Sequence, residues 1–318
     1  NDESMPQIVR RGGEDAKGRE SYGIDVKSVL AMVDRAWLPL PLFWRQKSGA
    51  FFKGPTNWAR VYVCQLDAPD ERGNQYRVVI ALDTTLMPFV ETEAYLAPSA
   101  SDAKDGRPFA LPPQDDPHID WFCQQEWVRS WAFEAFKEMK AREEQRRTGR
   151  RTERAVSDAQ AAEDMQGKHE HVARYRALLD LLHQLQLFRQ VVVIDRETDP
   201  RPTPIDVDFV LDLGNSRSCG LLIEREPNEM KVDITRAVAL QLRDLSQPEL
   251  VYREPFDSRV EFNRASFGRD HLSRKSGRAE AFSWPTVVRV GPEASRLAGR
   301  RQGSEGASGM SSPKRYLW

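Results

Sequence analysis

The chain has 318 residues, which is enough for two domains with a sizeable hydrophobic core. Its 47 lysines and arginines are balanced by 48 aspartates and glutamates, and the net charge of −1 argues against nucleic acid or an anionic membrane as the partner of the whole chain. Three widely spaced cysteines without a CxxC pair (Cys64, Cys123 and Cys219) indicate reduced core thiols and argue against a disulfide framework or a zinc site.

The chain begins with a polar segment. Residues 1–22 contain glycine and charges of both signs, which predicts a flexible arm. They lack the apolar stretch of a secretory signal, and no apolar run in the chain approaches the roughly 18 residues of a membrane span. We therefore expect a cytoplasmic protein. Helical spacing of apolar residues then predicts a helix over residues 23–38, which Pro39 should end.

Residues 59–147 predict two strands, a loop and one long helix. Apolar and polar residues alternate in 59–66 and 75–82, which predicts a hairpin with a long loop. Residues 97–117 are rich in Pro, Asp and Ser and predict a loop. A broad aromatic face predicts one long helix over residues 119–147, and such a face is more typical of a core than of a surface that stacks nucleic-acid bases.

The clearest helical stripe lies at residues 171–188. His169, His171 and His183 lie in or beside it, but no carboxylate or cysteine completes a metal-binding set, so we interpret all three as surface residues. A short strand and a proline-rich boundary follow. We assign residues 23–204 to one α+β domain with long helices.

The second half starts with a strand, a polar turn and a second strand. Residues 206–226 contain two apolar runs joined by the sequence DLGNSRSCG, which predicts a buried β-hairpin. Asp212 ends the first run, where an unpaired carboxylate is costly. A turn rich in glycine and serine can point successive N–H groups at an anion, and Asp212 can hold a hydrated divalent cation on that anion. The same residues are also ordinary turn formers that need no ligand.

The remaining elements are shorter. Residues 231–242 predict a strand, and the arginine-rich residues 267–281 predict an exposed loop. Residues 283–290 predict another short strand. A short helix is expected over residues 291–300, with a proline near its start and a glycine near its end.

Several motifs of this half, in the same order, resemble the actin-like ATPase superfamily of actin, sugar kinases and heat-shock chaperone ATPases. Residues 212–216 (DLGNS) resemble its first phosphate loop, Asp-x-Gly-x-Ser/Thr. The sequences WPTVV (284–288) and VGPEA (290–294) are similar to the chaperone segments Thr-Pro-Ser-Val-Val and Val-Gly-x-x-Ala, and PKRYL (313–317) resembles Lys-Arg-Leu-Ile. Together the motifs favour nucleotide binding.

More closely, VLDLGNSRSCGLLIE together with SSPKRYLW resembles the SrfB family of large bacterial proteins labelled virulence factors. The matching motifs cover about residues 205–318. The first 200 residues are connected to the family only by their position in the chain and their aromatic character. It implies an α/β chain, α+β overall, in which residues 205–318 are the incomplete start of an actin-like, ribonuclease H-like mixed-sheet ATPase domain. Because such proteins are several times longer, we expect this chain to be an N-terminal fragment.

The resemblance also implies roles for four residues of the turn. Asp212 would hold Mg²⁺ through water. Gly214, Asn215 and Ser216 would bring backbone N–H groups, and Ser216 also its hydroxyl, to the β- and γ-phosphates of ATP.

Two basic residues belong to the same expected site. Arg217, where chaperones have an aromatic residue, would either clamp phosphate or pair with a carboxylate. Lys314 aligns with a chaperone lysine that approaches the γ-phosphate and the attacking water, and the alternative is a surface lysine before an apolar anchor. The second phosphate loop and the adenosine pocket are not found in this sequence, so we expect little turnover from this chain.

The sequence therefore predicts an ATP- and Mg²⁺-binding protein whose nucleotide state drives binding of a protein partner. The alternative is a non-catalytic scaffold or virulence-associated interaction protein that keeps the fold without hydrolysis. It would use the aromatic N-terminal half, which holds six of the eight tryptophans before residue 132, and an exposed aromatic patch would favour it. A sugar-kinase-like phosphotransferase is a third hypothesis, for which no acceptor or general base is found.

Overall fold

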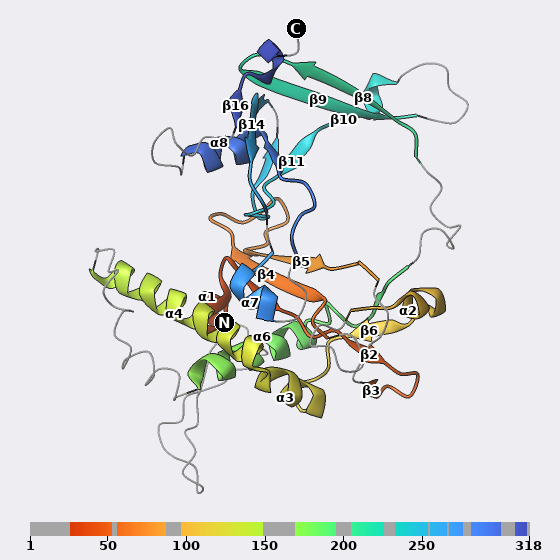
Figure 1. Ribbon diagram of the computed structural model, residues 1–318, viewed down its shortest axis with the longest axis vertical. Helices are drawn as coiled ribbons and strands as arrows, with labels where there is room; N and C mark the ends of the chain where they lie inside the picture. Colours follow the sequence, from red (N-terminus) through yellow and green to blue (C-terminus); the bar gives the residue numbers. More distant parts are fainter. Residues whose placement is uncertain are drawn as a thin grey trace, which may run out of the picture. The chain divides into compact units, whose positions relative to one another are not determined.

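The computed structural model describes residues 26–52, 56–86, 97–148, 169–194, 205–225, 233–253, 255–265, 267–275, 281–299 and 309–316. Within these ranges the chain combines helices with several small antiparallel sheets, so the predicted mixed α and β class is confirmed (Figure 1). The predicted arm at residues 1–22 lies outside the described residues. The chain forms two compact units, one of residues 1–195 and 268–282 and one of residues 196–267 and 283–318.

The first unit combines two sheets with helices. One sheet has the strand order β1-β4-β5, with β1 (Ala36–Pro39), β4 (Ala59–Gln65) and β5 (Tyr76–Leu82). The other has the order β3-β2-β6-β7, with β2 (Phe43–Arg45), β3 (Phe51–Phe52), β6 (Pro108–Ala110) and β7 (Val191–Val192). The helices are α1 (Val26–Val33), α2 (Ala100–Asp105), α3 (Pro117–Gln124), α4 (Glu126–Thr148), α6 (Glu170–Gln184) and α7 (Asp270–Lys275).

The predicted helix at residues 23–38 is too long in its C-terminal part. The helix ends at Val33, Arg35 has a left-handed backbone with φ of 56°, and β1 begins at Ala36. The following residues pair antiparallel with β4, with Trp37 opposite Tyr62. Pairing with this buried strand outweighs the helical spacing of the same apolar residues, which is a local preference only.

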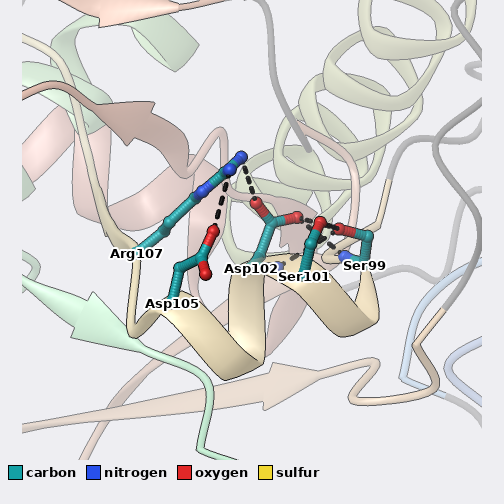
Figure 2. Close-up of polar contacts among 5 residues, drawn as sticks. All are labelled: Ser99, Ser101, Asp102, Asp105 and Arg107. Atoms are coloured by element: carbon teal, nitrogen blue, oxygen red, sulfur yellow. Dashed lines mark hydrogen bonds and ion pairs between the residues drawn. The ribbon is translucent and has the colours of Figure 1, made fainter.

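The loop predicted at residues 97–117 contains a helix and a strand. The hydroxyl of Ser99 accepts a hydrogen bond from the Asp102 amide, and the Asp102 carboxylate accepts one from the Ser99 amide at 2.8 Å, which is a capping box at the start of α2 (Figure 2). Arg107 donates to Asp102 at 3.1 Å and to Asp105 at 3.0 Å. The Asp and Ser residues that indicate a loop are here the cap of a helix.

The aromatic face predicted for residues 119–147 is part of the core, but the residues form two helices. Gln125 is extended, with ψ of 131°, and separates α3 from α4. The indole of Trp131 on α4 donates to the Trp37 carbonyl at 2.7 Å, and the hydroxyl of Tyr175 on α6 donates to the Pro39 carbonyl at 2.7 Å. These two bonds attach both long helices to β1.

Arg60, near the start of β4, is completely buried, with 0% of its surface exposed. Its guanidinium carbon lies 4.9 Å from the ring centroid of Trp131, 5.4 Å from that of Trp127 and 4.0 Å from that of Phe282. One guanidinium nitrogen also donates to the carbonyls of Asn57 and Ala59. A desolvated cation between aromatic rings contributes on the order of 2 kcal/mol per contact. We call Arg60, Trp127, Trp131 and Phe282 the arginine box.

The prediction of an exposed loop at residues 267–281 is wrong for the described residues 267–275 and 281. Residues 270–275 form α7, which packs on α4, and Leu272 and Ala281 are buried. A Cβ at Gly268, where φ is 146°, would lie 2.6 Å from the Trp131 ring, so the segment fits this closely only with glycine. The few apolar residues among many arginines gave no periodic signal for this packing.

The second unit consists of short strands and one longer hairpin, β8 (Val207–Leu213) and β9 (Arg217–Glu224). The other strands are β10 (Ala237–Ala239), β11 (Gln241–Arg243), β12 (Val251–Arg253), β13 (Phe256–Asp257), β14 (Arg259–Phe262), β15 (Val288–Val290) and β16 (Met310–Ser311). They form the sheets β10-β9-β13 with β8 on β9, β11-β12, and β15-β14-β16. The short helices are η2 (Ile234–Arg236), α8 (Gly291–Gly299) and η4 (Pro313–Tyr316). The helix predicted at 291–300 is thus confirmed.

A buried ion pair fixes α8. Arg296 donates to both carboxylate oxygens of Asp244, at 2.6 and 2.9 Å, and Asp244 also accepts from the amides of Ser246 and Gln247. The carboxylate of Glu293 accepts from the Ser246 hydroxyl at 3.0 Å. Burial, followed by the charge of Asp244, raises the pKa of Glu293. Both oxygens of the buried Asp244 carboxylate therefore accept hydrogen bonds, which offsets the cost of burying its charge.

Replacing Phe282 with alanine tests the arginine box. We expect the free energy of unfolding to fall by about 3–5 kcal/mol, because a large ring is lost and the Arg60 charge is left partly uncovered. Trypsin should also cleave after Arg274 in α7 faster than in the wild type. The control is Leu187→Ala, at a residue that is 50% exposed in the same unit, which should change stability by less than about 0.5 kcal/mol. If Phe282→Ala kept the stability and the cleavage rate of the wild type, the arginine box would not be what holds α7 in place.

Candidate functional site

The predicted hairpin is present. Strands β8 and β9 pair antiparallel over seven residue pairs, from Val207 opposite Glu224 to Leu213 opposite Ser218 (Figure 1). The prediction that it is buried is wrong for β8, where Phe209 is 54% exposed and Val207, Val210 and Leu211 are exposed to a similar extent. Among the described strands β8 pairs with β9 alone. Its apolar side chains are therefore exposed on both faces.

The turn of the hairpin requires its first glycine. A Cβ at Gly214 would collide with the carbonyl oxygen of Arg217, so no other residue fits this close approach of the backbone. Asn215 and Ser216 are exposed. Outside the strand ladder, the amides of these three turn residues donate no hydrogen bond to another described residue. Three successive N–H groups are thus available to an anion.

Ser258 connects the turn to the end of the second unit. Its amide donates to the carbonyl of Ser216 at 2.9 Å, and its own carbonyl accepts from the amide of Ser312 at 2.8 Å. Its hydroxyl lies 2.7 Å from that of Ser218. The residues after Ser312 form η4, which carries the half-buried Lys314. Two predicted parts of the site, about 100 residues apart in sequence, thus meet through one serine that sequence analysis missed.

The charged residues of the turn are exposed. Asp212 lies opposite Cys219 in the hairpin, and Arg217 lies opposite Asp257 in the pairing of β9 with β13. Neither the Asp212 nor the Arg217 side chain forms a hydrogen bond or ion pair with another described residue. Of the two roles expected for Arg217, pairing with a carboxylate of the described residues is therefore not observed, and the guanidinium is available to a ligand.

Among the described residues, no cluster of protein ligands accompanies Asp212. The described residues contain no group of three or more His, Cys, Asp or Glu that could hold a metal ion. A cation at Asp212 would need water and phosphate oxygens as its other ligands, which is how Mg²⁺ is usually held with nucleotides.

The three cysteines are free, and burial raises the pKa of Cys123 to about 12. None of the helices in the described ranges is long and apolar enough to cross a membrane.

The six early tryptophans belong to the core. Trp58 and Trp131 have no exposed surface, and Trp37 and Trp127 are also buried. Trp44 and Trp121 are half-buried. The exposed aromatic patch that would favour the scaffold alternative is therefore not formed by these residues.

The interpretation of His171 as a surface residue is wrong. His171, on α6, is 1% exposed and packs against α4, with its ring centroid 5.1 Å from that of Phe133. Burial, followed by the charges of His169 and Arg129, lowers the pKa of His171 to about 4. The ring is therefore neutral at physiological pH and acts as a core residue.

Comparison with known proteins identifies a family. The family model described as "Virulence factor SrfB" matches residues 2–318. The match extends over the N-terminal half, which the sequence motifs did not reach. No curated protein and no solved structure matches the chain.

Replacing His171 with leucine should remove an acid-sensitive part of the stability. Its pKa is about 4 in the folded chain against about 6.5 when unfolded, so the neutral ring contributes stability that is complete above pH 6.5 and is lost as the pH falls toward 4. This difference corresponds to on the order of 3 kcal/mol. Urea unfolding near pH 7 and near pH 4.5 should show a loss about 2–3 kcal/mol smaller in His171→Leu than in the wild type. The exposed His271→Gln serves as a control with the wild-type profile, and equal losses in all three proteins would contradict the assignment.

Proposed function

The chain belongs to the SrfB family of virulence factors, and from this premise we propose that its second unit binds ATP with Mg²⁺ at the turn between β8 and β9. One observation carries the proposal. The backbone bonds of Ser258, the residue between β13 and β14, to Ser216 and Ser312 bring the turn and the segment of Lys314 to the same residue. Two separate motifs that resemble one nucleotide site thereby become neighbours in the structure.

The residues of the turn suit a nucleotide phosphate bound to Mg²⁺. The exposed Asp212 supplies one carboxylate, and Mg²⁺ in nucleotide sites usually takes one or two carboxylates together with waters and phosphate oxygens. The available amides of Gly214, Asn215 and Ser216 supply donors for the β- and γ-phosphates. Arg217 and Lys314 supply positive charge to the same oxygens.

For this chain we propose binding, and we assign turnover to a complete site. Phosphoryl transfer depends on positioning and charge neutralisation from both sides of the phosphates, and the turn with Lys314 provides one side. In a complete site, closure over the nucleotide would change the surface that is offered to a protein partner. The role of the nucleotide is thus to control an interaction.

An interaction protein without hydrolysis is the second candidate function. The observation that favours it is the exposed apolar row of β8, led by Phe209 and Val210. An exposed edge strand with apolar side chains is a surface on which other chains commonly pair or pack. In this case the hairpin would keep its shape and serve as a contact surface only.

Calorimetric titration of ATP with Mg²⁺ into the chain, with Asp212→Ala alongside, tests the proposal. We expect the mutation to weaken binding by roughly 10- to 100-fold, because a charge-assisted contact worth about 1.5–3 kcal/mol is lost. The matched control is Asp206→Ala, which removes the same charge about 20 Å away at the start of the same strand and should leave binding unchanged. Lys314→Ala should weaken binding as well.

Two results would contradict the proposal in different ways. If Asp212→Ala bound ATP as tightly as the wild type, the assignment of the site to this turn would be wrong. If the wild type did not bind ATP, the nucleotide function would fail and the interaction function of β8 would remain.

A further inference from the structure

A second site is formed in the first unit, away from the hairpin in sequence. A pocket of about 400 Å³ lies between strands β2, β3 and β6 and the turn that follows α6. Its size is in the range of small-molecule pockets, which are about 300–1,000 Å³. Ten residues line it: Arg45, Gly49, Phe51, Ala110, Leu111, Pro113, His183, Gln186, Phe188 and Arg189.

Leu111, directly after β6, fixes the shape of this pocket. Its amide donates to the carbonyl of Phe188 at 3.2 Å, and its carbonyl accepts from the ring of His183 at 3.0 Å. Gln186, with φ of 53°, reverses the chain after α6 and so lets Phe188 return to the strand. The helix end and the sheet are thus joined on two sides of Leu111. The pocket is preformed and does not depend on a ligand for its walls.

The described residues that line the pocket carry positive charge and no negative charge. Arg45 and Arg189 both line it, and neither side chain has a hydrogen bond or ion pair with another described residue. No carboxylate is among the lining residues. Guanidinium groups in this situation bind carboxylates and phosphates, because their planar N–H pairs match two oxygens at once.

His183 adds a defined polar group. A carbonyl oxygen can only accept, so the hydrogen bond from Nδ1 of His183 to Leu111 places a proton on Nδ1. In the neutral ring Nε2 is then left as an acceptor, which suits the hydroxyl or protonated oxygen of a ligand.

The rest of the wall is apolar. Phe188 is buried, Phe51 is half-buried, and Ala110, Leu111 and Pro113 complete the apolar lining. A bare inorganic ion would leave these side chains in contact with water only. An organic anion with an apolar or aromatic body would use both the guanidinium groups and the apolar wall.

We propose that this pocket binds a small organic carboxylate with an apolar body. The carboxylate lies against Arg45 and Arg189, and the body lies against Phe51 and Phe188. All residues of the pocket belong to the first unit, so this proposal does not rest on nucleotide binding at the hairpin.

A ligand-observed NMR titration of the whole chain with benzoate tests this proposal. We expect benzoate to bind with a Kd of roughly 1 mM or tighter, as a small ligand can provide. Arg45→Gln and Arg189→Gln should each weaken binding about tenfold or more. The matched control is Arg72→Gln, an exposed arginine in the loop between β4 and β5 that removes the same charge outside the pocket and should have no effect.

Two further ligands test the chemical class. Benzamide has the same shape without the charge, and inorganic phosphate has the charge without the apolar body, so both should bind at least tenfold more weakly than benzoate. No benzoate binding, binding unchanged in both pocket variants, or an equal loss in Arg72→Gln would overturn the site. Benzamide or phosphate binding as tight as that of benzoate would overturn the assigned ligand class.

Discussion

The burial of Arg60 is the constraint on which the first unit depends. A guanidinium that is fully removed from water costs several kcal/mol unless other groups replace its hydration. Here two backbone carbonyls and three aromatic rings do so, and they come from Asn57, from β4, from α4 and from Phe282. The charge therefore specifies which elements must meet. It explains why the chain leaves the second unit for a short segment that returns to the first.

Elements with a strong local pattern could be predicted from the sequence. The strands β4 and β5, the helix α6 and the hairpin of β8 and β9 have regular apolar spacing, and the structure contains them. Two of the failures share one cause, which is that a tertiary contact outweighed the local pattern. Residues 36–39 pair with a buried strand, and Gly268 lies against Trp131, about 140 residues earlier in the chain. Neither contact leaves a periodic signal in its own segment.

The residues of the candidate sites divide in the same way, into those that a local motif identifies and those that only the tertiary structure brings together. The turn at residues 212–217 is one continuous motif, so its residues could be named from the sequence. Ser258 could not, because its role follows only from the pairing of β13 with β9 and from its contact with Ser312. The pocket of Arg45, His183 and Arg189 is built from segments more than 130 residues apart, and none of these residues belongs to a recognisable motif. Sites assembled by topology are visible only in the structure.

The two proposed sites would use positive charge in different ways, because only the hairpin site contains a carboxylate, that of Asp212. At the hairpin, Asp212 stands beside three available amides, so a polyphosphate is favoured only when a divalent cation bridges it to the carboxylate. The pocket has two guanidinium groups and no carboxylate, which disfavours a metal-bound ligand and leaves the charge for a free anion. Its apolar wall then selects among free anions by their organic part. The two proposed ligands would therefore not compete for one site, because each site lacks a feature that the other ligand needs.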